Sequence, residues 1–562
     1  MKHLKKFALG ALTIAIASCS SDEPVTPNQG PENNGNVYAT LTVKLPTGGT
    51  RAGNQGVEIG KDDENSVGRI LVLLATKNAQ DEYIFLARAE ADATHTGDGR
   101  PETGASGNNV NTIKYTLNFS ANDMTPDPLG TGDGSSIPGQ QDVYVFAYCN
   151  PTKSLRDIYN ALSKGDKIGE KHNSILAENA EIWQSGKFLM SNCEICKVPN
   201  GIPSREDLVG TYNTPENPWP LGTIRVKRVA ARFDFALGGD NNDNKYEIKD
   251  VLDPKKVVGT VELTKMAMFN IAKEFYYLPR VNTQWDWGGV TTLCGDPSLE
   301  GFVVSYGKDF KTQATISEAI VNANYHYPVT SLNGLNWQSI KPADWTGKTE
   351  DNPEDWTNDG NVDYRIWRYT SENTIPGYKD SQKPTDSQKA GISTGVVFKG
   401  EFTPADTELW NGNAVYVYNN ITYGDYNALK AYVTKYPETL VASAFEDVDA
   451  FKNVADDFDH KTSLITEETK GFKAYTPDAN GKYVMYYFYY NRHNTNDDPS
   501  VMGENEFGVV RNNVYKLKVT KVGTLGTPYA PKPDDPNEEE KAYFTVSCEV
   551  MPWTVRVNNV EF

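Results

Sequence analysis

The sequence is poor in cysteine, histidine and methionine, and positive charge is in deficit. Six cysteines and six scattered histidines among 562 residues exclude a disulfide scaffold and disfavour a metal centre. The 74 acidic residues outnumber the 55 basic ones, and the formal charge of −19 disfavours electrostatic binding of nucleic acid. Because 31 Tyr, 21 Phe and 10 Trp accompany only 8 Met, the composition favours strands over helical bundles.

Motifs for catalysis are absent or incomplete. The sequence contains no His-Glu-x-x-His, no phosphate loop and no dinucleotide fingerprint. Residues 391–395 match the Gly-x-Ser-x-Gly elbow, but the expected strand follows the serine instead of preceding it, so we predict a turn. The acidic stretch 240–250 lacks the glycine of a calcium loop and is predicted to be a solvated loop. We therefore expect no enzymatic activity, no metal and no cofactor.

Cys193 and Cys196 form a single C-x-x-C pair. Zinc would need two further ligands, and a redox motif would need a helix start after a strand. A structural disulfide or a pair of buried thiols is the preferred interpretation.

Long apolar runs are missing apart from one near the start of the chain. Three lysines lie within the first six residues, and the apolar run 7–17 follows them. This run is too short to span a bilayer and is typical of a secretory signal. Small residues lead directly into Cys19, which resembles a bacterial lipobox with a lipidated, palmitate-carrying cysteine. The alternative is an ordinary signal peptide with a chance cysteine.

A period of two follows a Pro- and Asn-rich tether. Apolar residues occupy alternate positions of a predicted half-buried strand, namely Val37, Ala39, Leu41, Val43 and Leu45. Pro46 ends this strand, and the loop 47–53 contains Arg51 and Ala52. Such a loop tip is a typical protease site, although composition alone would favour an exposed loop cation.

Many short strands with turn signals between them predict β-sandwich domains with a few short helices. We place a domain boundary near Leu221, after a long loop at 199–220. The second domain is expected to contain a loop-rich region, 282–388, that holds six of the ten Trp residues. Short helices are expected at 155–162 and 425–436.

The C-terminus carries a second alternating pattern. An acidic, Pro-rich spacer precedes Phe544, Val546, Cys548 and Val550; Pro552 interrupts the run, and Trp553, Val555 and Val557 continue it. Two interpretations are equally compatible with this pattern. The segment is either a strand held away from the body or a last strand that closes the chain's own sheet.

Together these pieces resemble the Bacteroidetes type V fimbrillins, and most closely the major subunit of short, Mfa-type fimbriae of the Porphyromonas kind. The resemblance is carried by the lipobox at Cys19, by 51–53, 143–150, 226–235, 508–513 and 544–553. It implies a mainly β fold of two transthyretin-like, Greek-key β-sandwich domains. The expected organisation is a signal peptide 1–18, a propeptide 19–51, an N-terminal domain 52–221, a C-terminal domain 222–541 and a donor strand 542–562.

The resemblance also implies a mechanism. An Arg-specific protease would cut between Arg51 and Ala52, releasing the lipid and the strand 37–45. The open groove would then be filled by the C-terminal strand of another copy, with Phe544, Val546, Cys548 and Val550 in the places of the removed apolar residues. Head-to-tail exchange does not close and gives a filament.

The implied partners are copies of the chain itself, accessory anchor and tip subunits, the protease, host or bacterial surface receptors, and the outer membrane through the lipid before processing. Adhesion, biofilm formation and virulence are the expected roles of a surface fimbrium. The main alternative is a surface lipoprotein that binds glycans on its Trp residues; an anchor or tip subunit is another. A secreted hydrolase lacks any supporting set of residues.

Overall fold

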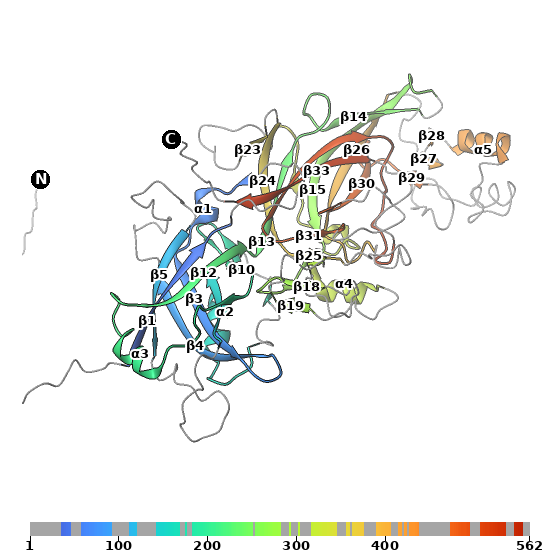
Figure 1. Cartoon of the computed structure of the whole chain (residues 1–562). Coiled ribbons are helices and arrows are strands. Elements are labelled where there is room, and N and C mark those ends of the chain that lie inside the picture. The colour runs from blue at the N-terminus through green and yellow to red at the C-terminus, as the bar shows by residue number, and fades with distance from the viewer. Residues whose placement is uncertain are drawn as a thin grey trace, which may run out of the picture.

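The computed structural model describes residues 35–46, 58–92, 112–120, 142–168, 175–176, 182–250, 253–282, 291–293, 302–303, 316–345, 356–359, 362–375, 389–405, 414–418, 421–423, 426–437, 473–494, 506–535 and 544–554. Within these residues the chain is mainly β with a few short helices, which confirms the predicted fold class. The strands gather in two regions, one at the lower left of Figure 1 and the other at the upper right.

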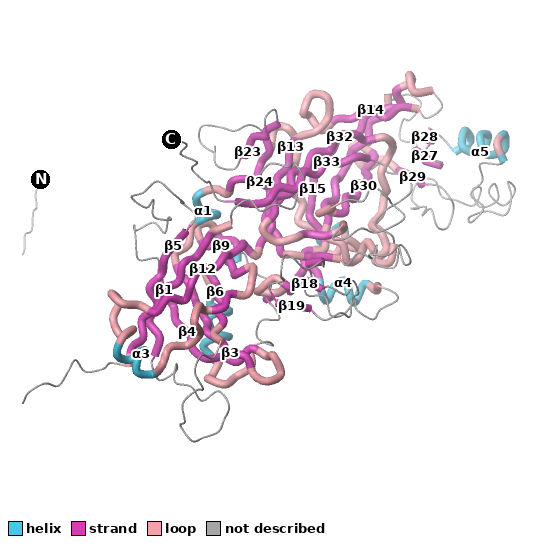
Figure 2. The backbone as a smooth tube through the Cα atoms, in the orientation of Figure 1, coloured by secondary structure: helices cyan, strands magenta, loops and turns pink. Residues whose placement is uncertain are grey.

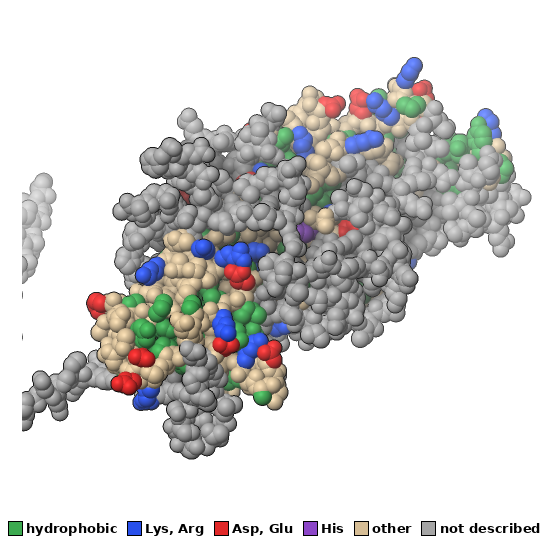
Figure 3. Space-filling model, in the orientation of Figure 1, with side chains coloured by type: hydrophobic (Ala, Val, Ile, Leu, Met, Phe, Trp, Pro, Cys, Tyr) green, Lys and Arg blue, Asp and Glu red, His purple; other side chains and the backbone are tan. Residues whose placement is uncertain are grey.

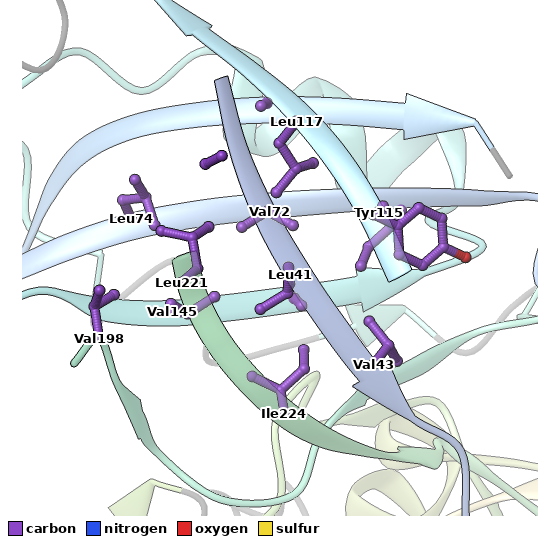
Figure 4. Close-up of a cluster of buried hydrophobic side chains, with 14 of the residues drawn as sticks. Leu41, Val43, Val72, Leu74, Tyr115, Leu117, Val145, Val198, Leu221 and Ile224 are labelled. Atoms are coloured by element: carbon purple, nitrogen blue, oxygen red, sulfur yellow. The ribbon is translucent and has the colours of Figure 1, made fainter. Parts of the chain in front are cut away.

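The first region is an eight-stranded sheet with the order β4-β3-β6-β10-β12-β1-β5, and β11 pairs with β6. Its strands are β1 (Asn36–Lys44), β3 (Arg69–Lys77), β4 (Tyr83–Asp92), β5 (Thr112–Ser120), β6 (Tyr144–Cys149), β10 (Met190–Asn192), β11 (Cys196–Lys197) and β12 (Trp219–Arg228). Their buried apolar side chains form one core (Figure 4). β3 and β4 pair antiparallel from Arg69–Asp92 to Lys77–Tyr83.

Two helices border this region. The predicted helix at 155–162 is confirmed as α2 (Lys153–Asn160), where the Thr152 hydroxyl accepts from the Leu155 amide at 3.2 Å. The loop expected at 199–220 is wrong in part, because it contains α3 (Arg205–Gly210). The Ser204 hydroxyl caps this helix by accepting from the Asp207 amide at 3.1 Å.

The second region contains two larger sheets. A six-stranded sheet has the order β2-β33-β32-β13-β24-β23, and a five-stranded sheet has the order β14-β15-β26-β30 with β22 beside β15. Phe235 of the six-stranded sheet contacts Phe398 of the five-stranded sheet, with ring centroids 5.7 Å apart, in a core that both sheets share. The strands are β2 (Glu58–Ile59), β13 (Ala230–Ala236), β14 (Lys245–Lys249), β15 (Val257–Phe269), β22 (Gln338–Ser339), β23 (Trp356–Asp359), β24 (Val362–Ser371), β26 (Gly395–Pro404), β30 (Tyr483–Tyr490), β32 (Asn513–Val522) and β33 (Phe544–Thr554).

Shorter elements complete the described chain (Figure 2). The helices are α1 (Asp62–Asn65), α4 (Glu318–Asn324), α5 (Tyr426–Lys435) and the 3-10 turn η2 (Leu332–Gly334). The remaining strands are β7 (Ile175–Leu176), β8 (Trp183–Gln184), β9 (Lys187–Phe188), β16 (Ile271–Ala272), β17 (Glu274–Phe275), β18 (Arg280–Asn282), β19 (Thr291–Leu293), β20 (Phe302–Val303), β21 (Tyr325–His326), β25 (Asn373–Thr374), β27 (Val415–Tyr418), β28 (Ile421–Tyr423), β29 (Lys473–Tyr475) and β31 (Gly508–Val509).

Two loop expectations differ from the structure. Within 240–250, residues 245–249 are strand β14, whose Tyr246 and Ile248 alternate toward the core, so the predicted loop is confined to the turn before it. The loop-rich region 282–388 contains β24, which pairs with both β13 and β23.

Leu221 lies inside β12, and the chain passes from the first sheet to the second between Arg228 and Ala230.

The predicted turn at 391–395 is confirmed. It precedes β26, and the Ser393 hydroxyl is buried and donates to the Lys389 carbonyl at 3.2 Å.

In the view of Figure 3, acidic and basic side chains are intermixed over the described surface of the first region. No described helix has the length and apolarity to cross a membrane. Nor do the described residues contain a group of three or more His, Cys, Asp and Glu able to hold a metal ion.

Candidate strand-exchange site

β1 lies between two partner strands in the first sheet (Figure 1). It runs antiparallel to β5 from the pair Asn36–Ser120 to the pair Lys44–Thr112. On its other side it runs parallel to β12, from Ala39 beside Trp219 onward, with one irregularity after Thr40. Removing β1 would therefore leave two strand edges facing an empty position, which we call the slot.

The alternating residues of β1 fill the core, as the period of two predicted. Val37, Ala39, Leu41 and Val43 are 0% exposed and Leu45 is 2% exposed. In Figure 4, Leu41 and Val43 of β1 lie in one cluster with Val72 of β3 and Val145 of β6, two strands that do not pair with β1. At ~1.5–3 kcal/mol for each large apolar side chain, the four larger residues contribute about 6–12 kcal/mol of burial. The slot without β1 would be a deep apolar surface.

One polar atom in this core lacks a partner. Tyr115 on β5 lies opposite Leu41 and is 1% exposed, and its hydroxyl has no hydrogen-bond partner among the described residues. Burial, reinforced by the nearby Cys149, raises the pKa of Tyr115 well above its ordinary value. Burial also raises the pKa of the Cys149 thiol to about 12, so that both groups stay protonated at neutral pH.

The C-terminal strand lies in the chain's own second region. β33 runs antiparallel to β32 from the pair Phe544–Val522 to the pair Asn513–Pro552, and it runs parallel to β2 at Trp553 and Thr554. The interpretation of a strand held away from the body is thus wrong for residues 544–554. Pro552 does not interrupt the strand either, because the pairing with β32 reaches it and β2 pairs only beyond it.

The side chains at the middle of β33 keep the predicted alternation. Val546 and Cys548 are half-buried and pack against the core of the second region, whereas Ser547 is exposed and donates to the Lys518 carbonyl at 3.2 Å. The Cys548 thiol lies 3.9 Å from the Arg492 carbonyl. β33 therefore has one apolar face, which the chain's own core covers in part.

A buried group of charges joins the two regions. We call it the junction cluster; its members are Glu58, Glu64, Arg228, Arg232, Asp234 and Lys516. The Arg232 guanidinium is 0% exposed and donates to Asp234 at 2.8 and 2.9 Å, to Glu64 at 3.0 and 3.1 Å, and to Glu58 at 2.8 Å. The Lys516 ammonium lies 2.8 Å from Glu58. Within the cluster Glu58, Glu64, Arg232, Asp234 and Lys516 each have a partner of opposite sign.

Two acids of the junction cluster belong to the segment that follows the Arg51 loop and attach it to the cluster. Glu58 belongs to β2, and Glu64 belongs to α1. The Glu64 carboxylate also accepts from the Tyr369 hydroxyl at 2.7 Å. Burial on its own would raise the pKa of Glu64, but Arg232 and the Tyr369 hydroxyl outweigh it and hold that pKa below its ordinary value.

Arg228 connects the end of β12 to the same junction. It is 0% exposed, and its guanidinium donates to the Glu64 carbonyl at 3.1 Å and to the Asn512 side-chain oxygen at 3.2 Å. Asn512 lies immediately before β32. Arg228, the last residue of β12, is therefore hydrogen-bonded both to α1 and to the residue just before β32, the strand that pairs with β33.

The four cysteines within the described residues, Cys149, Cys193, Cys196 and Cys548, form no disulfide. Cys193 and Cys196 are half-exposed thiols, so both the disulfide and the buried-thiol interpretations are wrong. Their sulfurs donate to the Arg225 and Thr223 carbonyls of β12 at 3.5 and 3.6 Å. Burial raises the pKa of the Cys196 thiol to about 11, which makes it a weak nucleophile.

The described tryptophans pack or donate inside the protein. Trp345 is 2% exposed and donates to the Phe235 carbonyl at 3.3 Å, and Trp337 donates to the Leu332 carbonyl at 3.1 Å. Trp367 packs against the core of the second region. Trp337 and Trp367 are half-buried. Trp285 and Trp287 lie outside the described residues.

The predicted site residues divide into three groups. Val37, Ala39, Leu41 and Val43 of the strand predicted to be removable lie in β1, and Leu45 directly follows it. The donor residues from Phe544 to Trp553 lie in β33. Cys19, Arg51, Ala52, Val555 and Val557 lie outside the described residues.

Sequence reasoning missed Tyr115 and the junction cluster. The charges at Arg232 and Asp234 within an otherwise apolar stretch were the available signal for the cluster.

The C-terminal part of the chain matches a protein-family model. Residues 480–559, which include β30, β32 and β33, match the family model described as the major fimbrial subunit protein type IV, fimbrillin, C-terminal. The chain resembles the fimbrillins. The resemblance predicted from the sequence is thereby confirmed.

Solved structures that match this chain include fimbrial proteins. The tip fimbrial protein Mfa3 from Porphyromonas gingivalis, with a C-terminal truncation, is 10% identical at a TM-score of 0.35, covering 92% of this chain and 100% of the other. A fimbrillin from Porphyromonas gingivalis is 13% identical at a TM-score of 0.34, covering 92% and 98%. A fimbrial assembly protein from Parabacteroides distasonis is 12% identical at a TM-score of 0.25, covering 66% and 99%. A comparison with curated proteins found no significant match.

Proposed function

We propose that this fimbrillin-like chain is a non-enzymatic structural subunit of a cell-surface fimbria. It is exported as a lipoprotein through Cys19 and polymerises after proteolysis at Arg51. The observation that supports this best is β1. It is a nine-residue strand whose alternate side chains are fully buried between β5 and β12, and it lies directly before the Arg51 loop.

The release of β1 would leave the segment after the Arg51 loop in place, because contacts that do not involve β1 hold that segment. The backbone of β1 pairs with β5 and β12, and its Tyr38 amide donates to the Tyr212 carbonyl at 2.8 Å. Beyond the loop, β2 and α1 are fixed by the junction cluster. Cleavage between Arg51 and Ala52 would leave the mature amino terminus anchored at Glu58, seven residues after Arg51.

The replacement for β1 would come from β33 of a second copy. Both strands carry apolar residues with a period of two, and β33 lies at the C-terminal end of a spacer that could extend to a neighbour. Because the structure places β33 against β32 in its own chain, donation requires β33 to leave that position.

The first test compares the wild-type precursor with Arg51→Ala on the cell surface. Terminal sequencing of the wild-type protein should find Ala52 as the first residue, and electron microscopy should show filaments. Arg51→Ala should keep the acylated Cys19 and remain monomeric. A wild-type protein that retains Cys19 would contradict the proposal and favour a lipid-held anchor subunit.

A second test uses two neighbouring residues of β33 with opposite exposure. Val546→Asp should prevent polymerisation of the cleaved subunit, because a carboxylate cannot enter the apolar slot. Ser547→Asp, on the exposed face, should polymerise normally. Since Val546 also packs against the chain's own core, thermal unfolding of both monomers is measured, and we expect a lower melting temperature for Val546→Asp. Filaments formed by both variants would contradict strand donation.

A further inference from the structure

We infer that the donor strand enters the slot in the direction of β1 and in one register, with Phe544 in the place of Val37 and Cys548 in the place of Leu41. This inference rests on the proposed function. It names which residues of two copies meet, and four features of the described strands lead to it.

The direction follows from where β1 begins. β1 is parallel to β12, and β12 ends at Arg228, which is bonded to Asn512 of the second region. The start of β1 therefore lies at the opposite end of the first region, where the Tyr38 amide donates to the Tyr212 carbonyl just beyond α3 (Figure 1). A donor running as β1 does keeps its own spacer at this outer end. A reversed donor would have to bring the spacer out at the junction between the two regions.

The period of two reduces the choice of register. Slipping a strand by one residue would turn its polar face into the core. If Val546, Cys548 and Val550 all lie within the span 37–45 with their apolar face inward, Val546 can take the place of Val37, Ala39 or Leu41.

Pro552 excludes the first of these three registers. With Val546 in the place of Val37, Pro552 would take the place of Val43, which is paired with Ile224 on β12 and with Ile113 on β5. Proline has no amide hydrogen for such a ladder. In the other two registers Pro552 falls beyond Lys44, the last residue of β1 that pairs with β5 and β12.

Ala39 decides between the remaining two. It is 0% exposed and lies between Trp219 on β12 and Leu117 on β5. With Val546 in the place of Leu41, Phe544 would replace this alanine and overfill a closed position. In the inferred register the smaller Val546 takes this place. Phe544 then replaces Val37, which pairs with Phe119 on β5 and precedes the first pair with β12.

Disulfide trapping in assembled filaments tests the register. Both test proteins carry Ile113→Cys and Cys149→Ala, the latter to remove a buried thiol near β5. The first also carries Cys548→Ala and Val550→Cys, and the second keeps the native Cys548. Directly opposite residues on antiparallel strands have Cα atoms about 4.5–5.5 Å apart, which suits a disulfide. Non-reducing gels and mass spectrometry of the linked peptides identify the bonds.

In the inferred register Val550 takes the place of Val43 opposite Ile113, so the first protein should form linked multimers and the second should not. Disulfide-linked multimers in the second protein alone would overturn the inferred register. They would show the register in which Val546 takes the place of Leu41 and Cys548 lies opposite residue 113. Filaments without links in either protein would overturn both the register and the direction. If the cleaved parent carrying only Cys149→Ala forms no filaments, the proposed function fails as well. Ile113 is half-buried, so its replacement should leave folding intact.

Discussion

At the residue scale the junction cluster is the most demanding arrangement, because it keeps several ionised groups away from water. Arg232 holds three carboxylates, and removing it would leave Glu58, Glu64 and Asp234 with a deficit of positive charge. Burial already raises the pKa of Asp234 above its ordinary value even with Arg232 in place. The cluster therefore tolerates the loss of one member poorly.

We expect Arg232→Ala to lower the free energy of unfolding by about 3–5 kcal/mol, the usual cost of leaving buried charges unpaired. The measurement is urea denaturation of the uncleaved protein. Lys153→Ala is the matched control, since Lys153 pairs with Asp157 on an exposed helix face and such pairs are worth about 0–1 kcal/mol. Equal midpoints for the two variants would contradict a stabilising role for the cluster.

His493 predicts a pH dependence in the second region. Its Nδ1 lies 3.0 Å from the Tyr515 hydroxyl, and burial lowers the pKa of His493 from 6.5 to about 4. As the pH falls, the unfolded chain takes up this proton first, so stability should decline between about pH 6.5 and 4. His493→Gln should flatten this decline when denaturation midpoints are measured from pH 7 to 4. Parallel curves for the two proteins would show that another group is responsible.

At the scale of elements, β1 is deeply buried although it is the strand proposed to be removed by cleavage. Its inward side chains are closed off on all sides, while the residues between them are half-buried or exposed. Such a strand stabilises the precursor most where its core residues are largest.

Leu41→Ala should therefore cost the precursor about 2–5 kcal/mol, as for other buried leucines. Thr42→Ala, on the opposite face of the same strand, should cost less than about 1 kcal/mol. Thermal unfolding of the uncleaved proteins distinguishes them. After cleavage and removal of β1, the two mature proteins should become identical in stability, because the altered residue leaves with the propeptide. A persistent difference would mean that β1 stays in place.

β1 and α2 could be predicted because their periods are local and uninterrupted. β24 and α3 could not, because they lie in polar, loop-like sequence and owe their formation to partners such as β13 or to a single cap at Ser204. For the candidate site, alternation predicted the two strands β1 and β33. It left open whether the C-terminal strand is held away from the body or closes the chain's own sheet, since a period of two fits any sheet with one apolar face.

At the scale of the whole molecule, the junction cluster makes the two regions depend on each other. Arg228 belongs to the first sheet, Lys516 to the second, and α1 contributes Glu64 between them. We expect calorimetry of the wild-type precursor to show one unfolding transition. Glu64→Gln should separate it into two, because the amide cannot accept the charge-assisted bonds from Arg232. Two transitions already present in the wild type would contradict this coupling.

The two-sided pairing of β1 has a mechanical consequence for any strand that replaces it. A donor that enters at the outer end and lies along the slot would be pulled lengthwise when the filament is stretched. Its bonds to β5 and β12 would then carry the force together, over the length that β1 now occupies, and would not open one after another. A thin filament joined in this way would resist breakage in flowing liquid although no covalent bond links its subunits.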